Sequence, residues 1–430
     1  MKDSIMKNMK KWLSYFKVTQ LKNVNFVNPF YIFGSVLVLV MLFYSFGWSY
    51  LYPALPLGLL MFFLFVLMSC VIIGKIFDKN LRLTFEDVKV FGHLENVTAL
   101  VILGYIISAI HHGGFPLISA LRGTYNDYAS FGIPTFHVIL VTFNSAFATY
   151  LFHVVLSMRK EERKKVLLLL ILNLLPSLLI VNRGMLILIL LNMFFIFIIR
   201  IKGKMKKKSA LTLLVLGLLG SYLFGLFGNF RLHNSYQRNY ATTDSSLFLY
   251  IGGATDSFRQ FPVPDAFFWT YIYATSPLAN LANTINYSSE ISLSSANFSS
   301  LIVNTILPDF ISKRINNFII FQAGYLIPIT PELNVATAFL QPYLIFGWLG
   351  MIIYVIVLFS FAYVYAFFLK KLDSSFYLVG MATMCTLFLM SFFANMLTFS
   401  GLSFQLVYPI AAGLVLKYKH KITWRLKKQQ

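Results

Sequence analysis

A set of arginine and histidine side chains in this 430-residue sequence has the chemistry to bind an anion and to exchange a proton. Arginine presents a planar, permanently charged fork that binds phosphate or carboxylate through two parallel hydrogen bonds. The arginines concerned are Arg122, Arg183, Arg231, Arg238 and Arg259. His233 follows Arg231 by two positions. His137 could act as a base or a hydrogen-bond donor in the same cavity as an anion that the arginines bind. These residue types predict an anion site.

Each of these residues also has a structural explanation. The arginines could form ion pairs with carboxylates nearby in the sequence, namely Asp244, Asp256 and Asp265. Arg183 could anchor a tight turn by extending its charge to the membrane surface. His137 could be a hydrogen-bonded core group, and His233 a solvated loop end. Whether these side chains bind an anion or have only structural roles depends on the elements that carry them.

The composition identifies those elements as membrane helices. Apolar residues make up 58% of the chain and charged residues 12%, with a mean hydropathy of +0.72. A soluble domain has about 45–50% apolar and about 25% charged residues. This excludes a soluble enzyme, a disordered chain, a disulfide scaffold and a nucleic-acid-binding domain. The expected fold is all-α, a polytopic integral membrane protein surrounded by membrane lipids.

Ten apolar segments approach the roughly 20 residues that a helix needs to cross the bilayer. They are 27–48, 54–75, 96–113, 132–157, 165–181, 184–200, 209–229, 343–369, 376–396 and 400–416. The first seven lie in 26–229 and the last three in 343–416, separated by a large loop over 230–342. Two apolar pieces of that loop, 266–281 and 318–329, would raise the number of spans to twelve. Residues 1–25 predict a helix on the inner membrane surface.

Basic residues fix the predicted orientation. With the N-terminus inside, inner segments, including a basic tail over 417–430, carry 29 lysines and arginines, and outer segments carry 7. Positive charge collects on the cytoplasmic side, so both termini are expected inside and the large loop outside. This also explains the net charge of +21 without a nucleic-acid partner. Lysine provides 24 of the 29 inner charges, whereas arginine provides 6 of the 7 outer ones.

The turn at 182–184 joins two predicted helices that are each about 26 Å long. Arg183 is therefore expected at or slightly below the outer membrane boundary, where an arginine is costly unless it is paired or faces a watery cavity. His137 is expected about 8 Å below the outer end of its span. No metal-ligand spacing and no glycine-rich phosphate loop occurs in the sequence, so we expect neither a metal nor another cofactor.

Four stretches resemble Wzy-type O-antigen polymerases. They are YNDY at 125–128 with FGIPTFH at 131–137, the turn NRG at 182–184, YATSPLANL at 273–281, and the run 337–350, which ends in FGWLG. The resemblance covers roughly residues 100–350 and agrees in span number and loop placement. Related polymerases often have an acidic residue before this Phe-Gly, where the present chain has Ile345, to which we assign no role.

The resemblance implies a GT-C-like enzyme of the bacterial inner membrane. Such proteins join oligosaccharide repeat units carried on undecaprenyl pyrophosphate at the periplasmic face, without metal or nucleotide. Arg183 and Arg231 would then contact the pyrophosphate, with Arg122, Arg238 and Arg259 in support. His137 and His233, with Asp256 behind them, are the candidate bases for the acceptor hydroxyl.

Three alternatives remain open at this point. An O-antigen ligase would use the same chemistry to move finished glycan onto lipid A core. A flippase or transporter of lipid-linked oligosaccharide would need basic residues along the middles of its spans, and the sequence has almost none there. A non-catalytic scaffold would bind polysaccharide chain-length regulators, a role that is compatible with catalysis.

Overall fold

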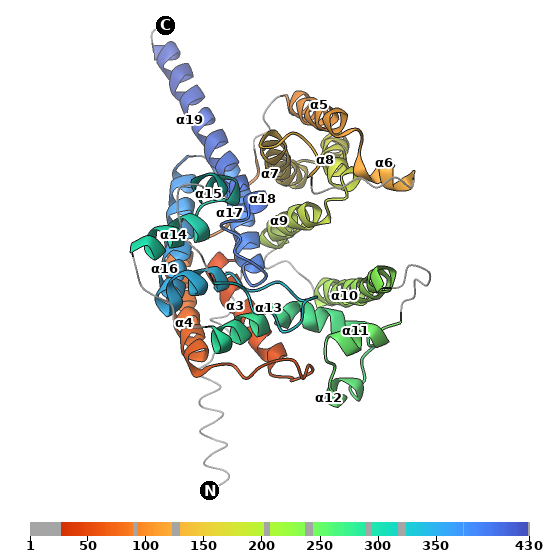
Figure 1. Cartoon of the computed structure of the whole chain (residues 1–430). Helices are drawn as coiled ribbons and strands as arrows, with labels where there is room; N and C mark the ends of the chain where they lie inside the picture. Colours follow the sequence, from red (N-terminus) through yellow and green to blue (C-terminus); the bar gives the residue numbers. More distant parts are fainter. Residues whose placement is uncertain are drawn as a thin grey trace, which may run out of the picture.

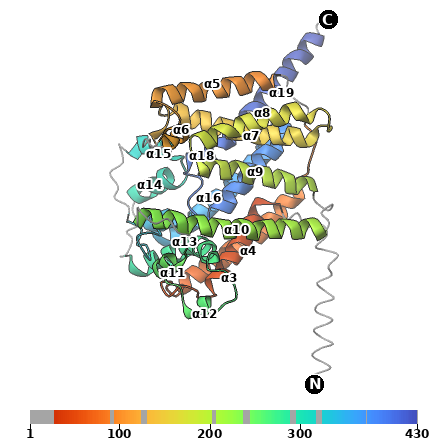
Figure 2. The ribbon, with the colours of Figure 1, turned by 90° about the vertical axis from the view of Figure 1, so that its right-hand side faces the viewer.

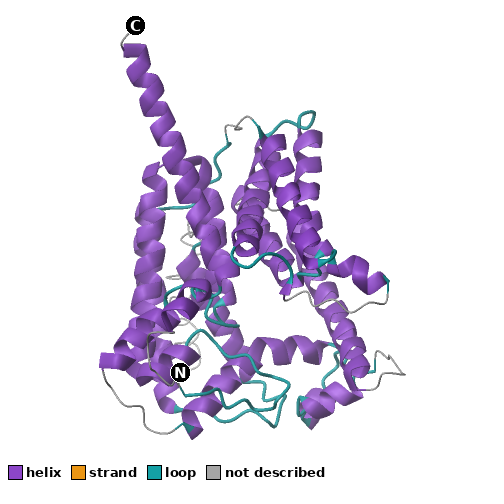
Figure 3. Ribbon diagram, turned by 45° about the horizontal axis from the view of Figure 1, so that its top comes forward, coloured by secondary structure: helices purple, strands orange, loops and turns teal. Residues whose placement is uncertain are grey.

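The computed structural model describes residues 27–88, 93–122, 130–201, 207–236, 244–288, 295–316, 324–372 and 374–428. Within these ranges every named element is a helix, and the only sheet-like pairing is an isolated bridge between Ser49 and Ala254 (Figure 3). The predicted surface helix over 1–25 lies outside the described residues.

Among the described residues, seven helices are long and apolar enough to cross a membrane, which confirms the expected class. They are α4 (Leu57–Asn80), α5 (Leu94–His112), α7 (Phe136–Ser157), α9 (Arg183–Ile201), α10 (Lys207–Tyr236), α16 (Leu340–Leu372), and the run from α18 (Ser400–Ser403) through η3 (Phe404–Leu406) into α19 (Val407–Lys428). Three other predicted segments contain shorter helices, α3 (Pro29–Tyr44), α8 (Arg163–Leu179) and α17 (Ser374–Met390). All ten predicted segments are thus helical, seven of them at full spanning length.

The long loop contains helices of its own. These are α11 (Ser246–Ile251), α12 (Asp256–Arg259), α13 (Phe267–Tyr287), α14 (Ser295–Thr305) and α15 (Asp309–Ile315), while α6 (Pro116–Leu121) lies in an earlier connection. The apolar piece 266–281 forms most of α13, which packs on α3 and α10. The piece 318–329 was expected to be helical, and this is wrong for residues 324–329, which form an extended connection. Asn280 fixes the end of that connection by accepting the backbone N–H of Ile329 at 2.8 Å.

The helices form two groups that are separate in Figure 1. One group contains α3, α4, α16, α17 and α19, and its core includes edge-to-face contacts of Phe30 with Phe359 and Phe388 at centroid distances of 5.2 and 5.6 Å. The other contains α5, α7, α8 and α9, which run roughly parallel in Figure 2. Helix α17 contacts both groups through α3, α16 and α9. The groups therefore share one interface in which a cavity can form.

The basic connections converge on one face of the molecule. Lys370 donates to the carbonyl of Asn80 at 3.2 Å, and the guanidinium of Arg200 lies 5.4 Å from the centre of the Phe85 ring. Lys165 forms an ion pair with Glu95 on the same face. The bridge between Ser49 and Ala254, and helices α13 to α15, belong to connections at the other ends of these spans. We call the first side the basic face and the second the opposite face.

Candidate functional site

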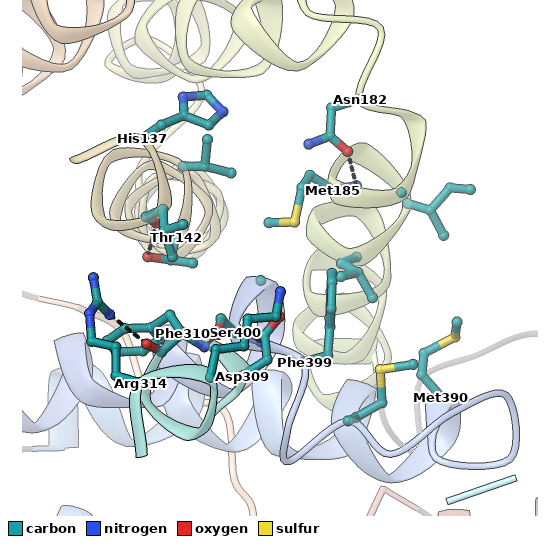
Figure 4. A pocket seen from close by; sticks show the side chains of 18 residues that line it. His137, Thr142, Asn182, Met185, Asp309, Phe310, Arg314, Met390, Phe399 and Ser400 are labelled. Atoms are coloured by element: carbon teal, nitrogen blue, oxygen red, sulfur yellow. Dashed lines mark hydrogen bonds and ion pairs between the residues drawn. The ribbon is translucent and has the colours of Figure 1, made fainter. Parts of the chain in front are cut away.

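A cavity of about 810 Å³ lies between the two helix groups on the opposite face. Its walls come from the first turns of α7 and α9, from α15, and from the connection that leads from α17 into α18 (Figure 4). The polar and charged side chains in these walls are His137, Thr142, Asn182, Asp309, Lys313, Arg314 and Ser400. Methionine, phenylalanine, valine and leucine side chains complete the lining. The cavity thus combines cationic groups with a largely apolar surface.

Helix α15 provides the charged wall. It is held in place by Asp309, whose carboxylate accepts hydrogen bonds from the backbone N–H of Ser400, at 3.2 Å, and from the Ser400 hydroxyl. The Asp309 backbone N–H donates to the carbonyl of Thr398 at 2.7 Å. Lys313 lies one turn later, with its Nζ 3.8 Å from Asp309 Oδ2. The carboxylate therefore anchors the helix and only partly balances the two cations.

Arg314 connects α15 to the N-terminus of α7. Its Nη2 donates to Thr135 Oγ1 at 3.0 Å, and its Nη1 donates to the carbonyl of Phe310. Thr135 has a φ of +68°, a conformation that costs a non-glycine residue of the order of 1–3 kcal/mol. Such strain is found at sites where the surrounding structure must hold a group in place. The guanidinium is fixed by two contacts and keeps further N–H donors for a ligand.

His137 lies in the first turn of α7 and lines the cavity, which agrees with the cavity-facing one of the two interpretations that the sequence left open. Gly132, with a φ of +87°, packs directly on the imidazole, because a Cβ at this position would lie 2.8 Å from Cγ and Nδ1 of His137. The Phe131 ring contacts the imidazole edge-on at 5.2 Å. The buried Nδ1 has no hydrogen-bond partner among the described residues. Packing among the described residues, rather than a hydrogen bond of Nδ1, therefore positions this imidazole.

The turn before α9 is the second predicted feature that reaches the cavity. Val181 has a φ of +62°, and Asn182 caps the helix by accepting the backbone N–H of Met185 at 3.1 Å. Asn182 and Gly184 line the cavity. Arg183, between them, is exposed and does not line it. The turn thus lies beside the cavity, but the arginine that lines it is Arg314 and not Arg183.

The other predicted residues lie elsewhere. Arg231 is exposed on α10 and donates to the Tyr273 hydroxyl at 3.2 Å. His233 is buried, and its Nε2 lies 3.1 Å from the carbonyl oxygen of Asp244. A hydrogen bond from the Ser246 hydroxyl holds the pKa of the Asp244 carboxyl below its usual range. The contact of Arg231 attaches α10 to α13, and the contact of His233 attaches it to the residues that lead into α11.

Asp256 and Arg259 are exposed at the two ends of α12, and Arg122 is exposed just after α6. Figures 1 and 2 both separate α10, α11 and α12 from α15 and α18. Arg238 lies outside the described residues. The predicted arginines therefore do not gather around one hollow in the described part of the chain.

Sequence reasoning missed Asp309, Lys313 and Arg314 as site residues. Two signals were available in the sequence. Asp309 and Lys313 lie one helical turn apart in a short segment that follows Pro308. The same segment carries two of the seven outer cations. Their position beside His137 depends on the contact between Arg314 and Thr135, which are 179 residues apart. No local pattern could have shown that contact.

No family model, curated protein or solved structure matches this chain.

Proposed function

We propose that the chain is an inner-membrane polymerase of the Wzy type, which joins undecaprenyl-pyrophosphate-linked oligosaccharide repeat units at the periplasmic face. The observation that carries the proposal is the cavity in which Lys313 and Arg314 lie on one wall and His137 lines another part. Cations and a histidine that line the same largely apolar cavity suit a lipid-linked anion that leaves while a hydroxyl attacks. In this proposal the GT-C-like architecture, the cytoplasmic termini and the periplasmic active site follow from the resemblance and from the charge distribution.

The proposed reaction exchanges one bond for another. The acceptor hydroxyl oxygen forms a bond to the anomeric carbon of the donor, and the bond from that carbon to the pyrophosphate oxygen breaks. The electron pair leaves with the lipid pyrophosphate, and the hydroxyl proton passes to His137. Arg314 and Lys313 stabilise the charge that develops on the leaving oxygen, a role in which one preorganised donor is worth about 3–4 kcal/mol.

The test is joining of lipid-linked repeat units by the purified protein. Longer glycans formed without any other protein support a polymerase, whereas transfer that occurs only onto lipid A core indicates a ligase. Movement of lipid-linked oligosaccharide across vesicles without any glycan product indicates a flippase. Either of these last two results would contradict the proposal.

Arg314 is the variant position that tests the mechanism. Arg314→Ala should lower the rate of glycan elongation by about 10²–10³-fold. Arg314→Lys should restore only part of that loss, because lysine lacks the bidentate fork. Arg259→Ala is the matched control, since Arg259 is exposed on α12 and does not line the cavity. Elongation by Arg314→Ala at the level of Arg259→Ala would remove the leaving-group assignment.

A further inference from the structure

The side-chain amide of Asn182 has a fixed orientation. Its Oδ1 accepts the backbone N–H of Met185 at 3.1 Å and so caps the first turn of α9. Because the oxygen is committed to the helix, the Nδ2 must point away from it. That nitrogen carries two N–H donors and has no hydrogen-bond partner in the part of the chain that the structure describes. The cap thus presents a neutral donor group.

This donor belongs to an uncharged part of the cavity. Figure 4 shows the Nδ2 of Asn182 turned into the cavity, toward the side on which His137 lies. Asp309, Arg314 and Ser400 lie toward the other end in the same view. Two apolar lining residues come from the same turns as these side chains, Val138 next to His137 in sequence and Met185 at the Asn182 cap. The cavity therefore has a charged end and a neutral, hydrogen-bonding end.

The two ends match the two reactants of the proposed reaction, on which this inference rests. An anionic pyrophosphate is bound best at the cationic end, because charge-assisted hydrogen bonds are stronger than neutral ones. The acceptor sugar carries no charge at its reacting hydroxyl and must lie beside the base. A neutral amide donor and apolar walls suit a sugar ring.

We propose that Asn182 binds the acceptor sugar. Its Nδ2 donates a hydrogen bond to a hydroxyl oxygen of that sugar and orients the attacking hydroxyl toward His137. The cavity then contains an acceptor subsite, formed by His137 and Asn182, and a donor subsite, formed by Lys313 and Arg314. The acceptor subsite should therefore discriminate between sugars, because a site built around a hydrogen bond rejects molecules that cannot make that bond.

Asn182→Asp tests this assignment with little risk to the fold. The variant has the same shape, keeps an oxygen for the Met185 N–H, and places a carboxylate at a helix N-terminus, where it is favoured. It replaces the N–H donor with an oxygen that can only accept, so a sugar hydroxyl that was held as an acceptor loses its donor and must turn its own O–H toward residue 182. Asn286→Asp is the control for added negative charge, since Asn286 is exposed on α13 and does not line the cavity.

The assay separates the two substrates. The donor is a lipid-pyrophosphate-linked repeat unit whose acceptor hydroxyl is methylated, and the acceptor is a labelled repeat-unit oligosaccharide that carries no lipid pyrophosphate. Asn182→Asp should raise the KM for the acceptor by about tenfold or more. The KM for the donor should stay within about twofold of the wild-type value, because the cationic end is unchanged.

Each result has one interpretation. An unchanged acceptor KM in Asn182→Asp, with active wild-type protein, overturns the acceptor subsite and leaves the proposed function standing. A rise in the KM for the donor alone assigns Asn182 to the pyrophosphate and likewise overturns the acceptor subsite. If the wild-type protein joins no glycans, the proposed function fails, and this inference fails with it.

Discussion

The position of His137 depends on the absence of a side chain at Gly132. Gly132 adopts a φ of +87°, which costs a residue with a Cβ about 1–2 kcal/mol, and an added Cβ would also contact the imidazole at 2.8 Å. Gly132→Ala should therefore displace the ring and lower elongation by about tenfold or more, since a small misplacement of a reacting group is costly. Gly113→Ala is the control, because Gly113 has a φ of +84° with open space at its Cβ position.

Gly132→Ala should lose more thermal stability in detergent than Gly113→Ala, because its added Cβ also contacts the imidazole, and only Gly132→Ala should lose activity. Equal activity in the two variants would mean that the packing on His137 is not needed for function. Thermal unfolding and elongation are measured on the same preparations, so that a loss of folded protein is not mistaken for a loss of catalysis.

At the residue scale the sequence identified part of this site. His137 and the turn at 182–184 could be found because their depth follows from helix length alone. Arg231 and His233 were chosen for their residue types at the start of the large loop, yet they bind Tyr273 and the Asp244 carbonyl. The residue type and its position in a loop do not show whether an arginine lines a cavity or forms a hydrogen bond between two helices.

At the scale of elements, α10 has two halves with different surroundings. A Cβ at Gly225 would lie 2.0 Å from the carbonyl oxygen of Ala266, and one at Gly228 would lie 2.6 Å from the Trp269 ring. Gly217, two turns earlier, has no neighbour within 4 Å of its Cβ position. The second half of α10 is therefore in backbone contact with α13, and the first half is not packed in this way.

Gly225→Ala should separate α10 from α13, because the contact is with rigid backbone. We expect a loss of about 1–3 kcal/mol, the usual cost of overpacking. Gly217→Ala should be neutral or should stabilise by up to about 1 kcal/mol, because alanine favours a helix more than glycine does. Thermal unfolding of both variants in detergent decides the matter, and a stable Gly225→Ala protein would show that the close approach is unnecessary.

Helix positions were predictable from apolar run length, but their internal breaks were not. Pro277 lies inside α13 without ending the helix, because packing of this largely buried helix outweighs the lost hydrogen bond. In α16 the helix is interrupted at Phe346 and Gly347, where Gly347 has φ and ψ of 60° and −147°. Only glycine readily adopts this conformation. A single glycine in an apolar run does not, however, predict that the helix is interrupted there.

At the scale of the molecule, the contacts place the lysine-rich connections on one face and the cavity on the other. The Nε2 of His153 donates to the Glu86 carbonyl at 2.9 Å, and Tyr377 donates to the Leu81 carbonyl at 2.6 Å, so the connection after α4 is fixed to α7 and α17. The side that each face occupies in the cell follows from charge, since cytoplasmic connections collect lysine and arginine. The cavity is accordingly predicted to face outward.

Labelling of single cysteines with a membrane-impermeant maleimide tests that orientation. The two native cysteines, Cys70 and Cys385, are 2% and 0% exposed, so the background should be low. Tyr250→Cys, at a residue on α11 that is 76% exposed, should react in cells whose outer membrane is permeable and whose inner membrane is intact. Lys160→Cys, exposed on the basic face, should react only after the inner membrane is opened. The reverse pattern would place the cavity in the cytoplasm, where lipid-linked repeat units could not be joined at the periplasmic face.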